Sequence, residues 1–304
     1  MVSPASARKA SAISLAIALS VTIASPVNAA PESQESALDT IEDIAPEVLA
    51  DVDTTTITGP PKNSDGSTNR ELSLESENGS LQIRLPKDGG TLTSSAEGIS
   101  ESDNGDSSST VALDKPDGGL QVVTVLENDN APSTYSYQFD SDELGSFEHG
   151  EDGEIAVLSK SGDPLAFVAP AWAKDANGTP VQTHYELDGS TLKQVVETDT
   201  DTSFPVVADP YLGVKMVKKV KWTKRAGGKT LVVTPTAGSR ALGGGYLPGK
   251  YGWKEVSKLG KTKSTQLKWQ YICHHQFAFT KKTYNLDTWK KRKSYADSVK
   301  HLCN

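Results

Sequence analysis

The sequence is poor in several residue types and motifs on which function is often built. Its 304 residues include two cysteines, two methionines and five histidines, and aromatic residues make up only 7%. It has no Cys-x-x-Cys pair, no complete P-loop and no Gly-x-Ser-x-Gly. A redox dithiol, a P-loop nucleotide site and a serine-hydrolase nucleophile elbow therefore have no sequence support.

Long apolar runs are also missing, except near the start of the chain. Two cations precede the uncharged stretch 10–27, and Val27-Asn28-Ala29 has the small-x-small pattern of a cleavage site. The most apolar part, 13–23, is too short to cross about 30 Å of hydrocarbon as a helix. The sequence predicts a signal peptide cleaved after Ala29. The mature chain is then expected to be secreted, extracellular or wall-associated, and not integral to a membrane.

Charge of one sign is nearly missing from each half. Residues 30–210 have 36 Asp and Glu against 8 Lys and Arg, whereas residues 211–304 have 21 Lys and Arg against 3 acids. The net charge of −8 therefore combines a strongly acidic region with a strongly basic one. This asymmetry predicts an anionic partner for the basic region: an envelope polymer, a lipid surface, nucleic acid or the chain's own acidic half. The alternative is two domains whose surfaces differ only for solubility.

Residues 30–70 divide into a helical part and a linker. Apolar residues at helical spacing, such as Leu38, Ile41 and Val48, predict a short amphipathic helix interrupted at Pro46. Residues 53–69 are mostly Thr, Ser, Asp, Gly and Pro, and they predict a disordered linker.

Residues 71–210 show short apolar alternations separated by turn dipeptides such as Asn78-Gly79 and Asp152-Gly153. The candidate strands are 72–74, 81–85, 121–126, 135–139, 154–158, 184–187 and 191–196. The polar stretch 95–109 is predicted to be an exposed mobile loop. The pattern favours an acidic all-β, sandwich-like domain.

Residues 211–304 mix strand and helix patterns. The predicted elements are a strand at 214–222, a strand at 230–234 ended by Pro235, a loop at 243–249, helical turns at 253–259, a helix at 264–281, a turn at 285–289 and a helix at 294–302. On the first strand, Lys215, Lys219 and Lys221 are expected on the face opposite Val220 and Trp222. These elements predict a small basic α+β domain.

The two cysteines, Cys273 and Cys303, both lie in this basic region. In an oxidising compartment they are expected to form a disulfide that staples the last helix, although two separate buried thiols remain the alternative. The chain-entropy model gives such a bond about 3–4 kcal/mol.

Few side chains in the basic region could support chemistry. A nuclease hypothesis takes His274 or His275 as general acid/base, Glu255 or Asp287 as its partner, and Arg240 as the phosphate ligand. Adjacent histidines on a helix point about 100° apart, so they do not converge on one metal ion. No metal or other cofactor is predicted, and a histidine beside a disulfide is more often structural.

A hypothesis without catalysis uses the lysines and aromatic residues together. Trp222, Trp253, Trp269 and Trp289 are interleaved with lysines, which suits anionic wall polymers or lipid headgroups. The alternative is that the aromatic residues form the core and the lysines a solvated face.

Two stretches resemble known secreted proteins. The segment 136–210, which ends in Pro205-Val-Val-Ala-Asp-Pro210, resembles a β module of secreted actinobacterial proteins and implies a boundary near Tyr211. Residues 222–304, with Cys273-His274, Asn285-Leu-Asp-Thr-Trp289 and the terminal Cys303-Asn304, resemble a family of secreted actinobacterial domains of unknown function. The resemblance implies no activity. Tyr284 and His275 stand where tryptophan is expected, which argues that these positions serve packing.

The sequence therefore predicts a multidomain chain with a signal peptide (1–29), an acidic region and linker (30–70), an acidic all-β domain (71–210) and a disulfide-stapled basic α+β domain (211–304). The leading hypothesis is a bacteriocin-like, antimicrobial antagonist whose basic domain binds an anionic envelope target while the acidic half acts as carrier or mask. A secreted nuclease toxin using His274 or His275 and a structural wall-associated protein are the alternatives. Catalysis is the less favoured expectation.

Overall fold

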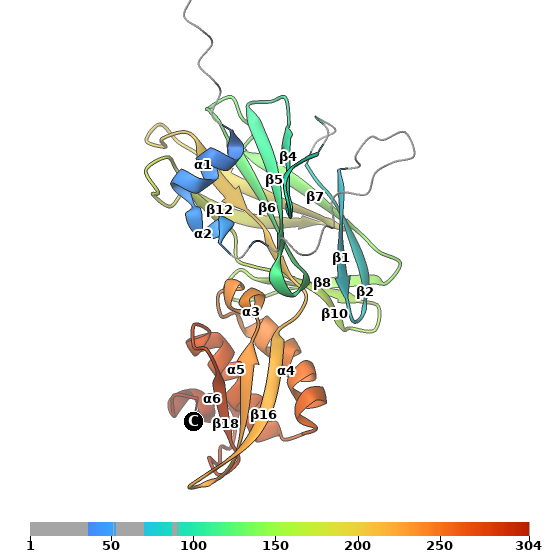
Figure 1. The fold of residues 1–304 in the computed structure, drawn as a ribbon, viewed down its shortest axis with the longest axis vertical. Coiled ribbons are helices and arrows are strands. Elements are labelled where there is room, and N and C mark those ends of the chain that lie inside the picture. Colours follow the sequence, from blue (N-terminus) through green and yellow to red (C-terminus); the bar gives the residue numbers. More distant parts are fainter. Residues whose placement is uncertain (1–35, 51, 53–69, 87–89, 91, 304) are drawn as a thin grey trace, which may run out of the picture. The chain divides into compact units, whose positions relative to one another are not determined.

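The computed structural model describes residues 36–50, 52, 70–86, 90 and 92–303 (Figure 1). The predicted signal peptide, the cleavage site at Ala29 and the linker at 53–69 lie outside the described residues. Within them the chain is mostly β-sheet with a few helices, which confirms the coarse fold prediction. No helix in this part of the chain is long and apolar enough to cross a membrane.

The described chain begins with two short helices, α1 (Ala37–Ile44) and α2 (Pro46–Leu49). Ser36 caps α1 by accepting a hydrogen bond from the backbone N–H of Asp39 at 3.2 Å. The predicted interruption at Pro46 is confirmed, because proline occupies the first turn of α2. Both helices bury apolar side chains, including Ile41 and Val48, against the larger of the two β-sheets that precede the C-terminal region.

The smaller sheet has five antiparallel strands in the order β1-β2-β7-β13-β12. Their bounds are β1 Glu71–Ser76, β2 Gly79–Arg84, β7 Thr134–Asp140, β12 Gln182–Asp188 and β13 Thr191–Glu197. The larger sheet has the order β3-β4-β5-β6-β15-β10-β9-β8, with β14 beside β6 and β11 beside β14. Its strands are β3 Thr93–Ala96, β4 Ile99–Asp103, β5 Ser108–Lys115, β6 Gly119–Leu126, β8 Leu144–His149, β9 Ile155–Ser159, β10 Pro164–Val168, β11 Trp172–Lys174, β14 Val206–Asp209 and β15 Tyr211–Gly213. A 3-10 turn at Pro116–Gly118 joins β5 to β6.

The burial patterns of the strands follow from which faces of each sheet are covered. Side chains from both sheets, such as Phe139 and Val157, form one hydrophobic cluster. In the smaller sheet, β7 alternates between buried and exposed residues because only one of its faces packs on that cluster. In the larger sheet, β6 and β9 are buried at every position, because α1, α2 and the C-terminal region cover its outer face.

The prediction of a mobile loop at 95–109 is wrong. Residues 93–96 and 99–103 form the hairpin β3–β4, and β5 begins at Ser108. Buried polar side chains between β4 and β5 are hydrogen-bonded to one another: the Asn104 Nδ2 donates to the Ser108 Oγ and to the Thr110 Oγ1, both at 3.0 Å. A strand at the edge of a sheet needs backbone partners rather than apolar side chains, so hydrophobic alternation does not reveal it.

The C-terminal region contains a three-stranded antiparallel sheet in the order β16-β17-β18 and four helices. The bounds are β16 Val217–Arg225, β17 Gly228–Pro235, α3 Ala237–Ala241, α4 Tyr246–Gly260, α5 Thr265–Ala278, β18 Tyr284–Asp287 and α6 Tyr295–Lys300. The predicted cap of α5 is confirmed, since the Ser264 Oγ accepts from the backbone N–H of Leu267 at 3.4 Å.

Two C-terminal predictions are wrong. The expected loop at 243–249 ends early, because α4 starts at Tyr246 and contains Pro248 and Gly249. Proline is tolerated in the first helical turn, where its missing N–H has no intrahelical partner. The expected turn at 285–289 is largely strand β18, which pairs with β17.

The C-terminal region shares its core with the larger sheet. Leu158, Phe167 and Tyr211 from that sheet lie in the same cluster as Leu231 and Tyr271. In addition, residues after the boundary expected near Tyr211 form β15, which pairs with both β6 and β10. Residues 35–304 consequently form one compact unit.

Candidate functional site

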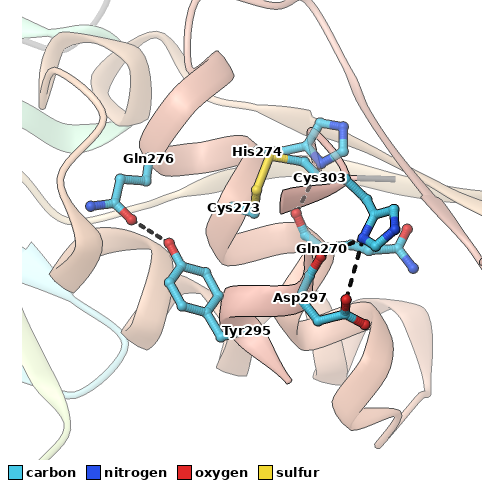
Figure 2. Close-up of a disulfide and its surroundings, with 8 residues drawn as sticks. Gln270, Cys273, His274, Gln276, Tyr295, Asp297 and Cys303 are labelled. Carbon is cyan, nitrogen blue, oxygen red and sulfur yellow. Dashed lines mark hydrogen bonds and ion pairs between the residues drawn. A yellow bond between two sulfur atoms is a disulfide. The ribbon is translucent and has the colours of Figure 1, made fainter. Parts of the chain in front are cut away.

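The predicted disulfide is present. Figure 2 shows the bond between Cys273 on α5 and Cys303, which follows α6, and the two Cα atoms are 5.3 Å apart. A hydrogen bond between the Tyr295 hydroxyl and the Gln276 Oε1 joins the same two helices. The bond therefore holds the end of the chain against the helix that contains both candidate histidines.

Both candidate histidines are buried. The His274 Nδ1 lies 2.9 Å from the Gln270 carbonyl oxygen, and its ring centroid lies 5.6 Å from that of Tyr284. The two nitrogens of His275 lie 3.1 Å from the Gly245 carbonyl oxygen and 3.2 Å from the Ser239 Oγ. Burial lowers the pKa of His274, and it lowers the pKa of His275 to about 4. His275 therefore joins α5 to α3 and to the start of α4, whereas His274 makes its contacts within α5 and with β18.

The two candidate carboxylates are occupied by local hydrogen bonds. The Asp287 Oδ1 accepts from the Thr230 hydroxyl at 2.6 Å across β17 and β18. Glu255 on α4 accepts the backbone N–H groups of Met216 and Val217, each at 2.9 Å, and burial raises its pKa. Within the described part of the chain, neither carboxylate is hydrogen-bonded to a histidine. The proposed acid/base pairs are therefore not assembled in this structure.

Arg240 and Trp289 also have structural contacts. The Arg240 Nη1 donates to the Pro235 carbonyl oxygen at 3.1 Å, at the end of β17. Trp289 covers the turn between β16 and β17, where a Cβ atom on Gly227 would lie 2.5 Å from the indole ring. The structure thus distributes the predicted site residues through the packing of the C-terminal region and does not gather them around one pocket.

Three lysines of α4 face the acidic region. Lys250, Lys254 and Lys258 recur every four residues and therefore lie on one face of the helix. They pair with Glu148, Asp163 and Glu77, respectively; the Lys250 and Lys258 pairs measure 2.7 and 2.8 Å. The charge asymmetry of the sequence thus has a direct structural counterpart between α4 and the β-sheet region.

The pairs differ in their surroundings. Glu148 also accepts from the Tyr251 hydroxyl, and the Lys250 Nζ lies 4.8 Å from the centre of the Tyr251 ring. Although burial raises the pKa of Glu148, the hydrogen bonds from Lys250 and Tyr251 bring it below its ordinary value. The Lys258–Glu77 pair is mostly exposed, and exposed pairs contribute little to stability.

A fourth acid of the β-sheet region, Glu154, contacts the first turn of α4. Its Oε1 accepts the backbone N–H of Leu247 at 3.1 Å, and its side chain is fully buried. A Cβ on Gly150 or Gly245 would lie within 2.4 Å of the Glu154 carboxyl carbon, so both glycines leave room for it. A carboxylate at this position satisfies unpaired N–H groups and complements the helix dipole.

The β16 cationic face, defined as Lys219, Lys221 and Arg225, points away from these contacts. The pairing register of β16 with β17 places the three side chains on one face of the strand, with Thr223 between them. On the opposite face, Val220 packs against the core, and Trp222, which is 40% exposed, donates from its Nε1 to the Gly260 carbonyl oxygen at 3.0 Å. All three cations are exposed, and Lys219 and Lys221 form no ion pair with the described residues.

Sequence reasoning identified part of this surface and missed the rest. The alternation along β16 correctly placed Lys219 and Lys221 opposite Val220. The four-residue spacing of the α4 lysines is visible in the sequence. However, Pro248 and Gly249 argued against a helix there, and the spacing places the lysines on one face only if the segment is helical. Glu148, Asp163 and Glu77 had no local signal, because only the tertiary fold brings them to α4.

Comparisons with known proteins add one assignment. No curated protein and no solved structure matches the chain. One protein-family model does match part of the chain, residues 217–304. This part begins at the first residue of β16 and includes the three-stranded sheet, the four C-terminal helices and the disulfide. Residues 217–304 form a DUF2599 domain, whose family is described as a protein of unknown function.

Proposed function

We propose that this chain is a secreted protein that binds an anionic polymer of the cell envelope through the β16 cationic face. The observation that supports this most directly is the contrast between two lysine-rich surfaces. The α4 lysines are paired with acids of the β-sheet region, whereas Lys219 and Lys221 are exposed without such partners among the described residues.

The spacing on β16 suits a polymer with repeated charges. Alternate residues of a strand project from the same face about 7 Å apart. Lys219, Lys221 and Arg225 therefore form a line of cations along the strand, interrupted only by Thr223. Lysines on an edge strand also discourage pairing with other chains, so binding has to be measured rather than inferred from charge.

The acidic region acts in this proposal as a carrier and as a partial mask. It covers the lysine face of α4 while leaving β16 open. Release of the C-terminal domain by proteolysis would expose three more cations, together with the apolar residues that now pack on the larger sheet, and would strengthen binding to polyanions. A bacteriocin-like antagonist would act after such release, whereas a wall-associated protein would bind without inhibiting growth.

The test compares two variants that lose the same charge from different surfaces. One replaces Lys219, Lys221 and Arg225 by serine, and its matched control replaces Lys250, Lys254 and Lys258 by serine. Binding of the oxidised mature chain to poly(glycerol phosphate) is measured over a salt series. The β16 variant should bind more weakly and show a salt slope smaller by about two to three, because fewer counterions are released.

The control should bind like the unaltered chain, because its lysines already face acids. Equal losses in both variants would reduce the effect to net charge and reject the β16 site. Tighter binding to single-stranded DNA than to the phosphate polymer would reassign the partner to nucleic acid. Growth inhibition of related bacteria by the released domain would favour the antagonist over the wall-associated protein.

A further inference from the structure

A cavity of about 470 Å³ lies where the N-terminal helices, the larger sheet and α3 meet. Its walls come from α2, β11, β14, β15 and α3, and they are mainly apolar. Representative lining residues are Val48, Pro170, Trp172, Tyr211, Ala237 and Ala241. Its volume falls in the range of small-molecule sites, which are also mostly apolar with few polar groups.

The approach of α3 to the sheet is close on one side of this cavity. A Cβ atom on Gly238 would lie 2.3 Å from the Tyr211 hydroxyl oxygen, so only glycine fits there. The contact fixes α3 against β15 without filling the neighbouring space. The cavity is therefore bounded by elements from both the acidic region and the DUF2599 domain.

Asp209 supplies a polar group that lacks a partner. The residue is 1% exposed and lines the cavity. Its Oδ2 accepts from the Gln121 Nε2 at 2.5 Å, whereas its Oδ1 has no hydrogen-bond partner among the described residues. An unsatisfied buried oxygen is costly, and structures seldom retain one without a reason.

The charged groups around Asp209 are engaged in other contacts. Lys115 donates to the carbonyl oxygens of Val48 and Ala50, and Lys174 pairs with Glu47 at the rim. Burial raises the pKa of Asp209 to about 8, and the Gln121 hydrogen bond offsets this only in part. A ligand that donates a hydrogen bond to the free oxygen would compensate this penalty.

We propose that the cavity binds a small molecule with an amino group on an apolar body. The amino group donates to the Asp209 Oδ1, and the apolar body lies against Pro170, Trp172 and Tyr211. Because Asp209 favours its neutral acid in the unliganded protein, an ammonium group binds with release of the carboxyl proton to solvent. The charge-assisted hydrogen bond that results, in a largely apolar cavity, gives such an amine an advantage over an alcohol of the same shape. This site is separate from the β16 cationic face and does not depend on polymer binding.

The test uses the oxidised mature chain with 2-phenylethylamine and its isosteric alcohol, 2-phenylethanol, followed by calorimetry and by the indole NMR signal of Trp172. The amine should bind more tightly than the alcohol. Asp209→Asn should weaken amine binding by about tenfold or more and change alcohol binding little, since only the ionised hydrogen bond is lost. Glu47→Gln, at the rim, serves as the matched control and should retain amine binding.

A second variant keeps the test decisive if Asp209→Asn fails to fold. Ala241 lines the cavity but is exposed on α3, so Ala241→Phe can fill the space without entering the core. It should abolish binding of both probes. No saturable binding of either probe to the unaltered chain, or equal amine binding by the Asp209→Asn variant, would overturn the proposal.

Discussion

The acidic β-sheet region and the basic C-terminal region bury their interiors by different means. The β-sheet region encloses one core between two sheets and contains no cysteine. The C-terminal region builds its core partly from the larger sheet, through residues such as Phe167 and Tyr211, and it adds a disulfide. A region of this size has limited apolar surface to bury, so a covalent link and a neighbouring sheet supplement its stability.

One buried ionisable group from each region shows a pKa shift opposite in direction to the other. Asp209, in the larger sheet, has a raised pKa and favours its neutral acid. His275, in the C-terminal region, has a lowered pKa and favours its neutral base. The two groups therefore give opposite dependences of stability on pH, and single substitutions can separate the contributions of Asp209 and His275.

The largest expected effect concerns Asp209. Its folded-state pKa of about 8 exceeds its ordinary value of 3.8, so the folded protein binds a proton that the unfolded chain has lost. This contribution to the free energy of unfolding is complete below about pH 4 and disappears as pH rises to about 8, by about 1.4 kcal/mol per pH unit. The charged neighbours Lys115 and Glu47 are retained in both variants of this pH experiment.

Asp209→Asn should remove this slope and make the protein more stable than the unaltered chain at pH 8 and above. Urea unfolding across pH 4–9 measures it, with the exposed Asp201→Asn as control. If Asp209→Asn leaves the slope between pH 6.5 and 8 unchanged, the carboxyl group is not held neutral by burial.

The next effect concerns the disulfide. Reduction, or replacement of Cys273 and Cys303 by serine, should lower the free energy of unfolding by about 3–4 kcal/mol, since the unfolded chain gains the freedom of an open loop. Protection of backbone amides from hydrogen exchange should fall more at Tyr284 and Trp289 than in the smaller sheet. Hydrogen exchange compares the two regions, and equal loss of protection in both would mean that they unfold as one cooperative unit.

His275 should contribute slightly less to the free energy of unfolding than the disulfide, and its pH dependence should be opposite in sign to that of Asp209. Its folded-state pKa of about 4 lies below its ordinary value of 6.5, so the unfolded chain takes up a proton first as pH falls. The stabilising contribution is complete above about pH 6.5 and is lost towards pH 4, which amounts to about 3 kcal/mol. His275→Gln should abolish this loss, whereas His301→Gln, at an exposed position, should not.

The smallest effects are expected at the α4 ion pairs. Lys250→Gln should destabilise the protein most of the three lysine variants, because Lys250 is half-buried and contacts both Glu148 and Tyr251. Lys258→Gln should have no measurable effect, since both members of its pair are more than 70% exposed. Thermal unfolding of the single variants checks this order, and a reversed order would show that burial does not set the strength of these pairs.

Much of the fold was predictable because local patterns suffice for it. The alternation in β7, the serine cap of α5 and the interruption at Pro46 all have short-range causes. The hairpin β3–β4 was missed because its mostly polar residues pair through the backbone, which hydrophobic alternation does not reveal. The start of α4 was missed because Pro248 and Gly249 are tolerated there only in a specific helical turn and packing.

The candidate site was less predictable than the fold. The rarity of His274 and His275 suggested chemistry, but burial and neighbouring carbonyl groups give them structural contacts. The cavity around Asp209 left no signal in the sequence, since its walls come from segments more than 150 residues apart, such as Val48 and Ala237. Only the cations on β16 could be anticipated from alternation along one strand.

The most direct measurement is to locate the polymer on the protein. Backbone NMR signals of the isotopically labelled, oxidised mature chain would be followed during titration with poly(glycerol phosphate). The proposal predicts the largest, saturable changes at Lys219, Lys221 and Arg225, with α4 residues 250–258 unaffected. Changes centred on α4, or spread evenly over all surface lysines, would contradict a binding site on the β16 cationic face.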